Sequence, residues 1–298
     1  MKSAAEIIAM SDLSAVYSIV PYILPFKCME AKFMQQAFIG LLLLAPMAAV
    51  MGIQVVNFRM AFFSDAISHS AFAGVAIGLI ASVNPSITMV AFAVFVGLAI
   101  TAMQSKSSLS MDTIVGVFFS AVVAFGIAIV SRDRSVARDM QLFLYGDILT
   151  ISTGDIFKLA ALALVIIVFM GLGYNRLLYI GLNHSLARAH RVKVALYQYM
   201  YAALLSVVVI FSVRAVGVLL VTALLIVPAA AARNLSRTAG AMFWWAILIS
   251  VTSAASGLII SAQEWAYTAT GATVILVAFA LFIISSLVSY FRSDSSKP

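Results

Sequence analysis

The sequence predicts an all-α, polytopic membrane protein with eight or nine transmembrane helices, and three observations support this fold class. Of the 298 residues, 64% are hydrophobic and only 10% are charged, a composition that excludes an ordinary soluble domain. Most of the chain divides into stretches without Lys, Arg, Asp or Glu, close to the roughly 20 apolar residues that a spanning helix requires. The single cysteine, Cys28, excludes an intrachain disulfide and a cysteine-cluster metal site.

The charge-free stretches give the order of the spans. The longest, 66–105, is twice the length of a span, and Asn84-Pro85 at its middle is a turn signal that divides it in two. The expected spans are then 33–57, 65–81, 86–105, 112–131, 157–175, 194–213, 215–231, 241–261 and 269–291. The second and seventh are short and rich in small residues, so a broken or partly re-entrant helix at either place would leave eight spans.

Residues 1–32 are expected to form an interfacial segment that leads into a transmembrane domain over 33–291. The apolar run 16–26 is too short to span a membrane and contains two prolines. If this run did span, the count would become ten and the N-terminus would be cytoplasmic. Residues 292–298 are expected to form a short cytoplasmic tail.

Basic residues in the short loops indicate the orientation of the chain in the membrane. With the C-terminus in the cytoplasm, alternation of the spans brings most of these residues to the cytoplasmic side. They are Arg59, Lys106, Arg176, Arg188, Arg191, Lys193, Arg233 and Arg237. The formal net charge of +7 therefore reflects cytoplasmic loops, since no basic run is long enough or interleaved with aromatic residues in a way that indicates nucleic-acid binding.

Two ionisable residues lie at the second expected span, where such residues are costly and usually functional. Asp65 and His69 are four residues apart, so on a helix they point to the same side. A carboxylate oxygen and an imidazole nitrogen are ligands for zinc, manganese and iron. The pair alone leaves two interpretations open: a metal-ligand pair, or an acid that caps a helix beside a histidine that bonds a neighbouring carbonyl.

The loop 181–193, on the expected cytoplasmic side, is long enough for one short helix with Asn183 as its N-cap. Its basic residues favour either of two roles: an anchor that follows the positive-inside rule, or a docking helix for a cytoplasmic partner. The residues expected to contact such a partner are Asn183, Ser185, Leu186, Ala187, Arg188 and Arg191.

The segment 217–235 places Pro228 next to four alanines, which is typical of a kinked helix packed closely against others. This segment and 65–81 are both short and rich in small residues, and such matched segments in two halves point to a transport site. Gly74, Gly217 and Pro228 are the residues expected to serve packing or gating.

Motifs of several enzyme classes are absent from the sequence. The chain has no P-loop for nucleotide binding and no H-E-x-x-H motif of a zinc protease. It has no serine nucleophile elbow, so enzymatic activity is not expected. A series of buried carboxylates, typical of a proton- or sodium-coupled carrier, is missing as well.

Ordered motifs along the chain resemble the membrane permease subunits of bacterial ABC importers for manganese, zinc and iron. The most specific is the run Asp65-Ala66-Ile67-Ser68-His69. The others, in order, are 112–116, 143–149 followed by Asp155, 216–220 continuing to 226–232, 256–258 and 270–272. The resemblance covers about 33–284. The chain departs from the family pattern at Ala73 and Ala269, which replace prolines, and in the loop 182–187, which has lost two acids.

The resemblance implies an obligate complex in the cytoplasmic membrane of a bacterium. Two copies of this chain would line one pathway, a dimer of cytoplasmic ATPases would drive transport, and an extracytoplasmic metal-binding protein would deliver Mn²⁺, Zn²⁺ or Fe²⁺. Asp65 and His69 would be transient ligands for the ion, one pair from each copy, and 181–193 would be the coupling helix. No cofactor is expected to be bound permanently, and ATP hydrolysis is expected on the separate ATPase. The alternative is a secondary metal/proton carrier that works without an ATPase.

The expected topology leaves the depth of the site open, because it places Asp65 near the cytoplasmic end of the second span. Either this span begins deeper than the charge-free run indicates, or the pair is a late point on the pathway.

Overall fold

A computed structural model of the chain describes residues 20–22, 25–131, 148–266 and 268–294. Within these residues, nine helices are long and apolar enough to cross a membrane, which confirms the all-α polytopic fold and the higher of the two expected counts. They are α2 (Lys32–Asn57), α3 (Phe63–Ile80), α4 (Pro85–Lys106), α5 (Met111–Val130), α7 (Thr153–Leu182), α9 (Val194–Val216), α10 (Val218–Leu235), α11 (Ala239–Ser261) and α12 (Thr270–Asp294). The short elements are η1 (Lys27–Glu30), η2 (Ile148–Thr150) and α8 (His184–Ala189).

The two short segments of small residues, α3 and α10, are each one continuous helix of 18 residues, so neither is broken. The expected turn between α3 and α4 is also present. The Asn84 side chain caps α4 by accepting a hydrogen bond from the Ser86 N–H at 2.9 Å. Pro85 is the first helical residue, a position where its missing N–H costs nothing.

Helix α7 is longer than the sequence indicates, with 30 residues in place of the expected 157–175. The charge-free criterion ended this span too early because Arg176 lies within the helix, where a long basic side chain can reach toward the membrane surface. The expected interfacial segment falls mostly outside the described residues, as do residues 143–147 of one family motif and 295–298 of the tail. The first residues of that tail continue α12 to Asp294.

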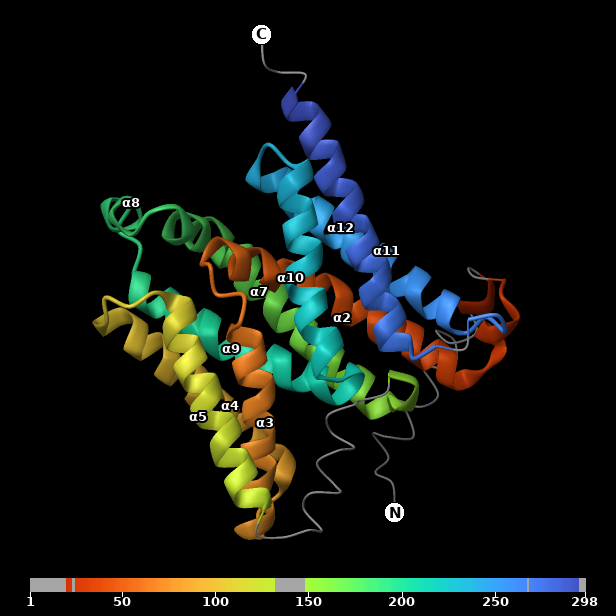
Figure 1. Ribbon diagram of the computed structural model, residues 1–298, viewed down its shortest axis with the longest axis horizontal. Coiled ribbons are helices and arrows are strands. Elements are labelled where there is room, and N and C mark those ends of the chain that lie inside the picture. Colours follow the sequence, from red (N-terminus) through yellow and green to blue (C-terminus); the bar gives the residue numbers. More distant parts are fainter. Residues whose placement is uncertain (1–19, 23–24, 132–147, 267, 295–298) are drawn as a thin grey trace.

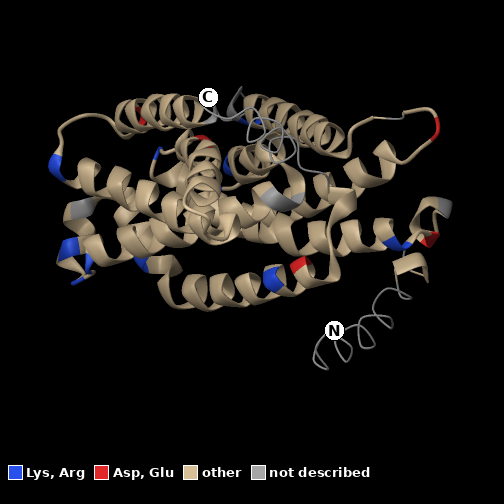
Figure 2. Ribbon diagram, turned by 90° about the horizontal axis from the view of Figure 1, so that it is seen from below, with Lys and Arg blue, Asp and Glu red and all other residues tan. Residues whose placement is uncertain are grey.

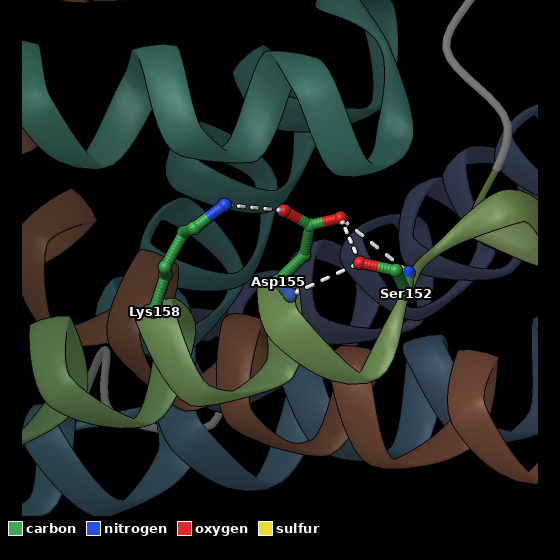
Figure 3. Close-up of polar contacts among 3 residues, drawn as sticks. All are labelled: Ser152, Asp155 and Lys158. Atoms are coloured by element: carbon green, nitrogen blue, oxygen red, sulfur yellow. Dashed lines mark hydrogen bonds and ion pairs between the residues drawn. The ribbon is translucent and has the colours of Figure 1, made fainter. Parts of the chain in front are cut away.

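The start of α7 is fixed by a reciprocal cap (Figure 3). The Ser152 hydroxyl oxygen accepts a hydrogen bond from the Asp155 N–H at 3.2 Å, and the Asp155 carboxylate accepts one from the Ser152 hydroxyl at 2.6 Å. Lys158 adds an ion pair to the same carboxylate at 3.1 Å. These groups satisfy donors that the first turn of a helix leaves free, so they define the expected outer end of the longest span.

The helices form two groups that α9 connects (Figure 1). In one group, α2 packs against α7, α10 and α11, and α12 packs against α10 and α11. In the other, α3 packs against α4 and α5, and α9 contacts both groups. Glycines bring neighbouring backbones together: an added Cβ would lie 2.6 Å from the Met89 Cα at Gly74 and 2.6 Å from the Val274 Cα at Gly257.

Basic residues lie predominantly at one side of the bundle. They occur at the ends of α4, α10 and α12, at the start of α9 and in the α2–α3 turn, and the alternation of the helices brings these ends to the same side. In Figure 2, many of the blue residues gather at the left end of the molecule. This distribution agrees with the expected cytoplasmic side.

Candidate metal site and coupling helix

Helix α3 begins near the middle of its neighbours. The Phe63 ring, in its first turn, faces Gly97, where an added Cβ would lie 3.2 Å from the ring. The same added Cβ would meet the Ser206 hydroxyl, so Phe63, Gly97 and Ser206 lie at one level. Gly97 and Ser206 are near the midpoints of α4 and α9. Asp65, two residues after Phe63, therefore lies near mid-depth in the bundle, and the span begins deeper than the charge-free run indicates.

Asp65 and His69 are half-buried, one helical turn apart on α3. The Asp65 carboxylate has Thr222 of α10 and His69 as its polar neighbours, and the Thr222 hydroxyl donates to the Leu219 carbonyl at 3.1 Å. The His69 ring meets the Phe119 ring of α5 edge to face at 5.0 Å, and the Phe72 ring of α3 at 5.6 Å. The two donor groups thus lie together between α3, α5 and α10.

The polar atoms around the pair belong mostly to buried serines. Ser64, Ser68 and Ser70 are each fully buried on α3. The Ser70 hydroxyl donates to the Ile67 carbonyl at 2.6 Å, whereas the Ser68 hydroxyl has no hydrogen-bond partner among the described residues. Within that part of the chain, no group of three or more His, Cys, Asp or Glu side chains could hold a metal ion. One copy of the chain therefore offers an ion the two donors Asp65 and His69 there.

Two of these neighbours, Thr222 and Phe119, were not predicted from the sequence. Phe119 is one of many aromatic residues in apolar spans, and nothing in its surroundings marks it. Thr222 carried a signal, because it is the only residue with a hydroxyl group in the stretch 217–232. A lone hydroxyl in a segment suspected of lining a pathway is a reasonable candidate for a contact with a buried acid.

The structure places the three expected packing residues at close contacts or breaks. Gly74 brings α3 against the backbone of α4. Gly217 separates α9 from α10 with φ of 84°, in the left-handed region that favours glycine. Pro228 is buried inside α10, where it removes one helical hydrogen bond. The role of these three residues in packing or gating stays a prediction.

Residues 184–189 of the expected coupling loop form α8, with Asn183 as the expected N-cap. The Asn183 side chain accepts hydrogen bonds from the backbone N–H groups of Ser185 at 2.7 Å and Leu186 at 3.4 Å. Ser185, Leu186, Arg188 and Arg191 are exposed. Ala187 is fully buried, so its side chain packs α8 onto the bundle and does not face the cytoplasm. The described exposed residues of α8 are thus Ser185, Arg188 and the apolar Leu186 and Ala189, and Arg191 follows the helix.

The end of α8 is held against α7 by an aromatic stack. The His190 ring lies parallel to the Tyr179 ring, with centroids 4.8 Å apart and planes at 8°. The next residue, Arg191, has φ of 57°, and Val192 N–H donates to the Ala187 carbonyl at 3.0 Å. The His190 ring is exposed, and its stack on Tyr179 secures the corner between α7 and α8.

Comparisons with known proteins cover the whole bundle, including both sites. The model of the ABC 3 transport family matches residues 30–289. The high-affinity zinc uptake system membrane protein ZnuB of Haemophilus influenzae is 32% identical over 244 residues, which are 82% of this chain and 93% of ZnuB. The manganese transport system membrane protein MntC of Listeria monocytogenes is 31% identical over 260 residues, which are 87% of this chain and 91% of MntC.

A solved structure has the same fold. The structure of PsaBC from Streptococcus pneumoniae in complex with Fab contains a chain that superposes with a TM-score of 0.74 at 26% sequence identity. The match covers 91% of this chain and 94% of that chain.

Proposed function

Because the chain belongs to the ABC 3 transport family, we propose that it is the permease subunit of an ATP-driven importer of divalent manganese, zinc or iron. The chain is a metal ABC transporter permease, a multi-pass protein of the bacterial cytoplasmic membrane. The relatives named for zinc and manganese support this range of ions. The energy source of transport, the ligands of the ion and the partner subunits are part of this proposal.

The observation that carries the proposal is the mid-depth position of Asp65 and His69. A divalent ion cannot cross hydrocarbon unaided, because it needs ligands that replace its water shell. A carboxylate and an imidazole on one helix face would supply two such ligands near the middle of the neighbouring helices. Two ligands also hold the ion loosely enough for release, whereas a closed set of four is typical of structural sites.

A second copy of the chain would complete the pathway. The two donors of one copy leave most of the coordination shell of a divalent ion unfilled, and a two-fold partner would bring an identical pair. The small residues around Asp65 and the short α10 beside it allow close approach of helices. We therefore propose a homodimer with the ion passing between the two α3 helices.

Helix α8 would transmit the conformational change of a cytoplasmic ATPase to the membrane helices. It lies on the basic side of the bundle, and its exposed residues Ser185, Leu186, Arg188 and Arg191 would contact the ATPase. An extracytoplasmic metal-binding protein would deliver the ion to the opposite side. Closure of the ATPase dimer would then change which side of the membrane the ligand pair faces.

Uptake of Mn²⁺, Zn²⁺ and Fe²⁺ into vesicles that contain the purified complex tests this function. We expect uptake to require ATP and the ATPase subunit, and to be abolished by Asp65→Asn and by His69→Ala while the complex still assembles. Asp112→Asn is the matched control, because Asp112 is an exposed acid at the start of α5. Uptake that continues without the ATPase would identify a secondary carrier. Normal uptake by both variants would show that Asp65 and His69 are not the ligands.

A further inference from the structure

The last turn of α7 rests directly on the turn that leads into α3. A Cβ added to Gly181 would lie 3.1 Å from the Asn57 Cβ and 3.4 Å from the Phe58 ring. Contacts this close leave no room for a side chain at position 181 unless the α2–α3 turn shifts. Gly181 precedes the α8 cap Asn183 by two residues, so the base of α8 is in contact with the end of α2, where the α2–α3 turn begins.

The α2–α3 turn is short and internally bonded. Phe58 N–H donates to the Gln54 carbonyl at 2.8 Å, Met60 N–H to the Val55 carbonyl at 3.0 Å, and Phe63 N–H to the Met60 carbonyl at 3.0 Å. Arg59 adopts φ of 55°, which reverses the chain within the turn, and Met60 is buried. Because Phe58, Arg59 and Met60 are bonded to the end of α2 and Phe63 is bonded to Met60, we expect a displacement of the turn to move the first turn of α3 with it.

A buried tyrosine links the same turn to α9. The Phe58 ring meets the Tyr201 ring edge to face, with centroids 5.4 Å apart and planes at 88°. The Tyr201 hydroxyl donates to the Met51 carbonyl of α2 at 2.7 Å. Tyr201 is almost completely buried, so this contact holds the Phe58 ring between α7 and α9.

A polar cavity of about 360 Å³ lies beside this turn. Its polar lining comes from the α2–α3 turn, α4, the cap of α8 and α9, with the side chains Asn57, Arg59, Gln104, Asn183 and Gln198. The size and polarity of the cavity suit water, which can rearrange when its walls move. The α2–α3 turn therefore contacts Gly181 on one side and the cavity on another. Because the cavity is not filled by side chains, the turn has room to shift.

We infer that α8, the last turn of α7 and the α2–α3 turn form one coupling joint, in which Gly181 and Phe58 are positioning residues that transmit the movement of α8 to Asp65 and His69. The inference rests on the proposed function, because it takes α8 as the ATPase contact. The route is a continuous set of packed contacts: the Tyr179–His190 stack, Gly181 against Asn57 and Phe58, and the bonded turn into Phe63. The ligand pair begins two residues further on.

The first test places a larger side chain at Gly181, in its contact with the α2–α3 turn. In the complex with the ATPase and the metal-binding protein, we expect Gly181→Leu to lower ATP-driven Mn²⁺ or Zn²⁺ uptake by about tenfold while ATP hydrolysis continues. Gly171→Leu, on the same helix, is the matched control, because an added Cβ there meets nothing within 4 Å. Equal uptake per ATP hydrolysed by the two variants would overturn the inference. Co-purification of the ATPase shows that each variant assembles.

The second test links the two elements covalently and does not depend on a bulky substitution. Asn57→Cys and Gly181→Cys, combined with Cys28→Ser, place two Cβ atoms close to the separation of about 3.5–4.5 Å that a disulfide requires. If the elements move as one joint, the oxidised complex retains uptake similar to that of the reduced complex. Loss of uptake on oxidation that reduction restores would show that the contact opens during transport and would overturn the inference. Failure of the unmodified complex to take up any metal would instead count against the proposed function.

Discussion

The imidazole of His69 and the ring of Phe119 meet edge to face, with centroids 5.0 Å apart and planes at 90°. The contact joins α3 to α5 and restricts the orientation of the imidazole that we propose as a metal ligand. An aromatic edge-to-face pair contributes about 0.5–1.5 kcal/mol beyond the area that it buries. Phe119 therefore restricts the orientation of the His69 ring.

Replacement of Phe119 should weaken metal binding without removing it. We expect Phe119→Leu to raise the metal concentration needed for half-maximal uptake by about two- to tenfold, the range that corresponds to the lost ring contact. Phe125→Leu is the matched control on the same helix, because Phe125 stacks on Phe92 and not on His69. Uptake titrations with Mn²⁺ and Zn²⁺ measure the effect, and an equal shift in both variants would contradict a specific role for Phe119.

Metal uptake should decrease as the pH falls through the range in which imidazole gains a proton, ordinarily near about pH 6.5. Neutral His69 has a free nitrogen lone pair, whereas the protonated ring has none and repels a cation, so uptake is favoured on the alkaline side. Below that range, the apparent affinity should fall by about tenfold per pH unit, since one proton competes with one ion.

The variant His69→Gln provides the control for this pH dependence, because an amide oxygen does not titrate. We expect its residual uptake to be lower throughout and to lack the same slope. ATP hydrolysis measured in the same vesicles separates an effect on the ATPase from an effect on the site. An unchanged slope in His69→Gln would assign the titration to another group.

Substitution of Gly74 should destabilise the protein. The added Cβ of Gly74→Ala would lie 2.6 Å from the Met89 Cα, so the backbones of α3 and α4 must move apart. Overpacking of this kind costs about 1–3 kcal/mol. At Gly116 an added Cβ meets nothing within 4 Å, so Gly116→Ala should be neutral or slightly stabilising. Thermal unfolding in detergent compares the two variants, and equal midpoints would contradict the close contact.

Two adjacent residues of α8 should respond differently to the same new charge. Arg188 is exposed, so Arg188→Glu should leave the fold intact and reduce metal-stimulated ATP hydrolysis by weakening the contact with the ATPase. Ala187 is fully buried, so Ala187→Glu forces a charge into the packing between α8 and the bundle and should also lower thermal stability. Arg292→Glu, at the end of α12, controls for the change in net charge. The same loss of stability in Arg188→Glu would show that this residue serves the fold.

The sequence predicted the number, order and approximate ends of the helices, because hydrocarbon requires long apolar stretches and a change of composition marks their ends. The criterion failed at α7, since Arg176 lies within a helix whose ends reach the interface. The cap at Asn183 was predictable because a capping side chain acts on the backbone only two or three residues away.

The neighbours of Asp65 and the depth of the site were not predictable in the same way. Thr222 is 157 positions from Asp65 in the chain, and only helix packing brings the two together. The depth of Asp65 depends on where α3 begins relative to α4 and α9. A count of apolar residues within one helix does not give the position of that helix relative to its neighbours. The inward orientation of Ala187 likewise depends on how α8 packs against the bundle.

Gly217 is the single residue that joins α9 to α10, so its backbone torsion sets the direction of α10. Thr222 is five residues from this junction, about 7.5 Å along the helix axis at about 1.5 Å per residue. A rotation of about 20° at this junction would therefore displace the Thr222 hydroxyl by roughly 2.6 Å relative to Asp65. A residue that cannot hold φ of 84° would change the position of Thr222 beside the acid, although it touches neither residue.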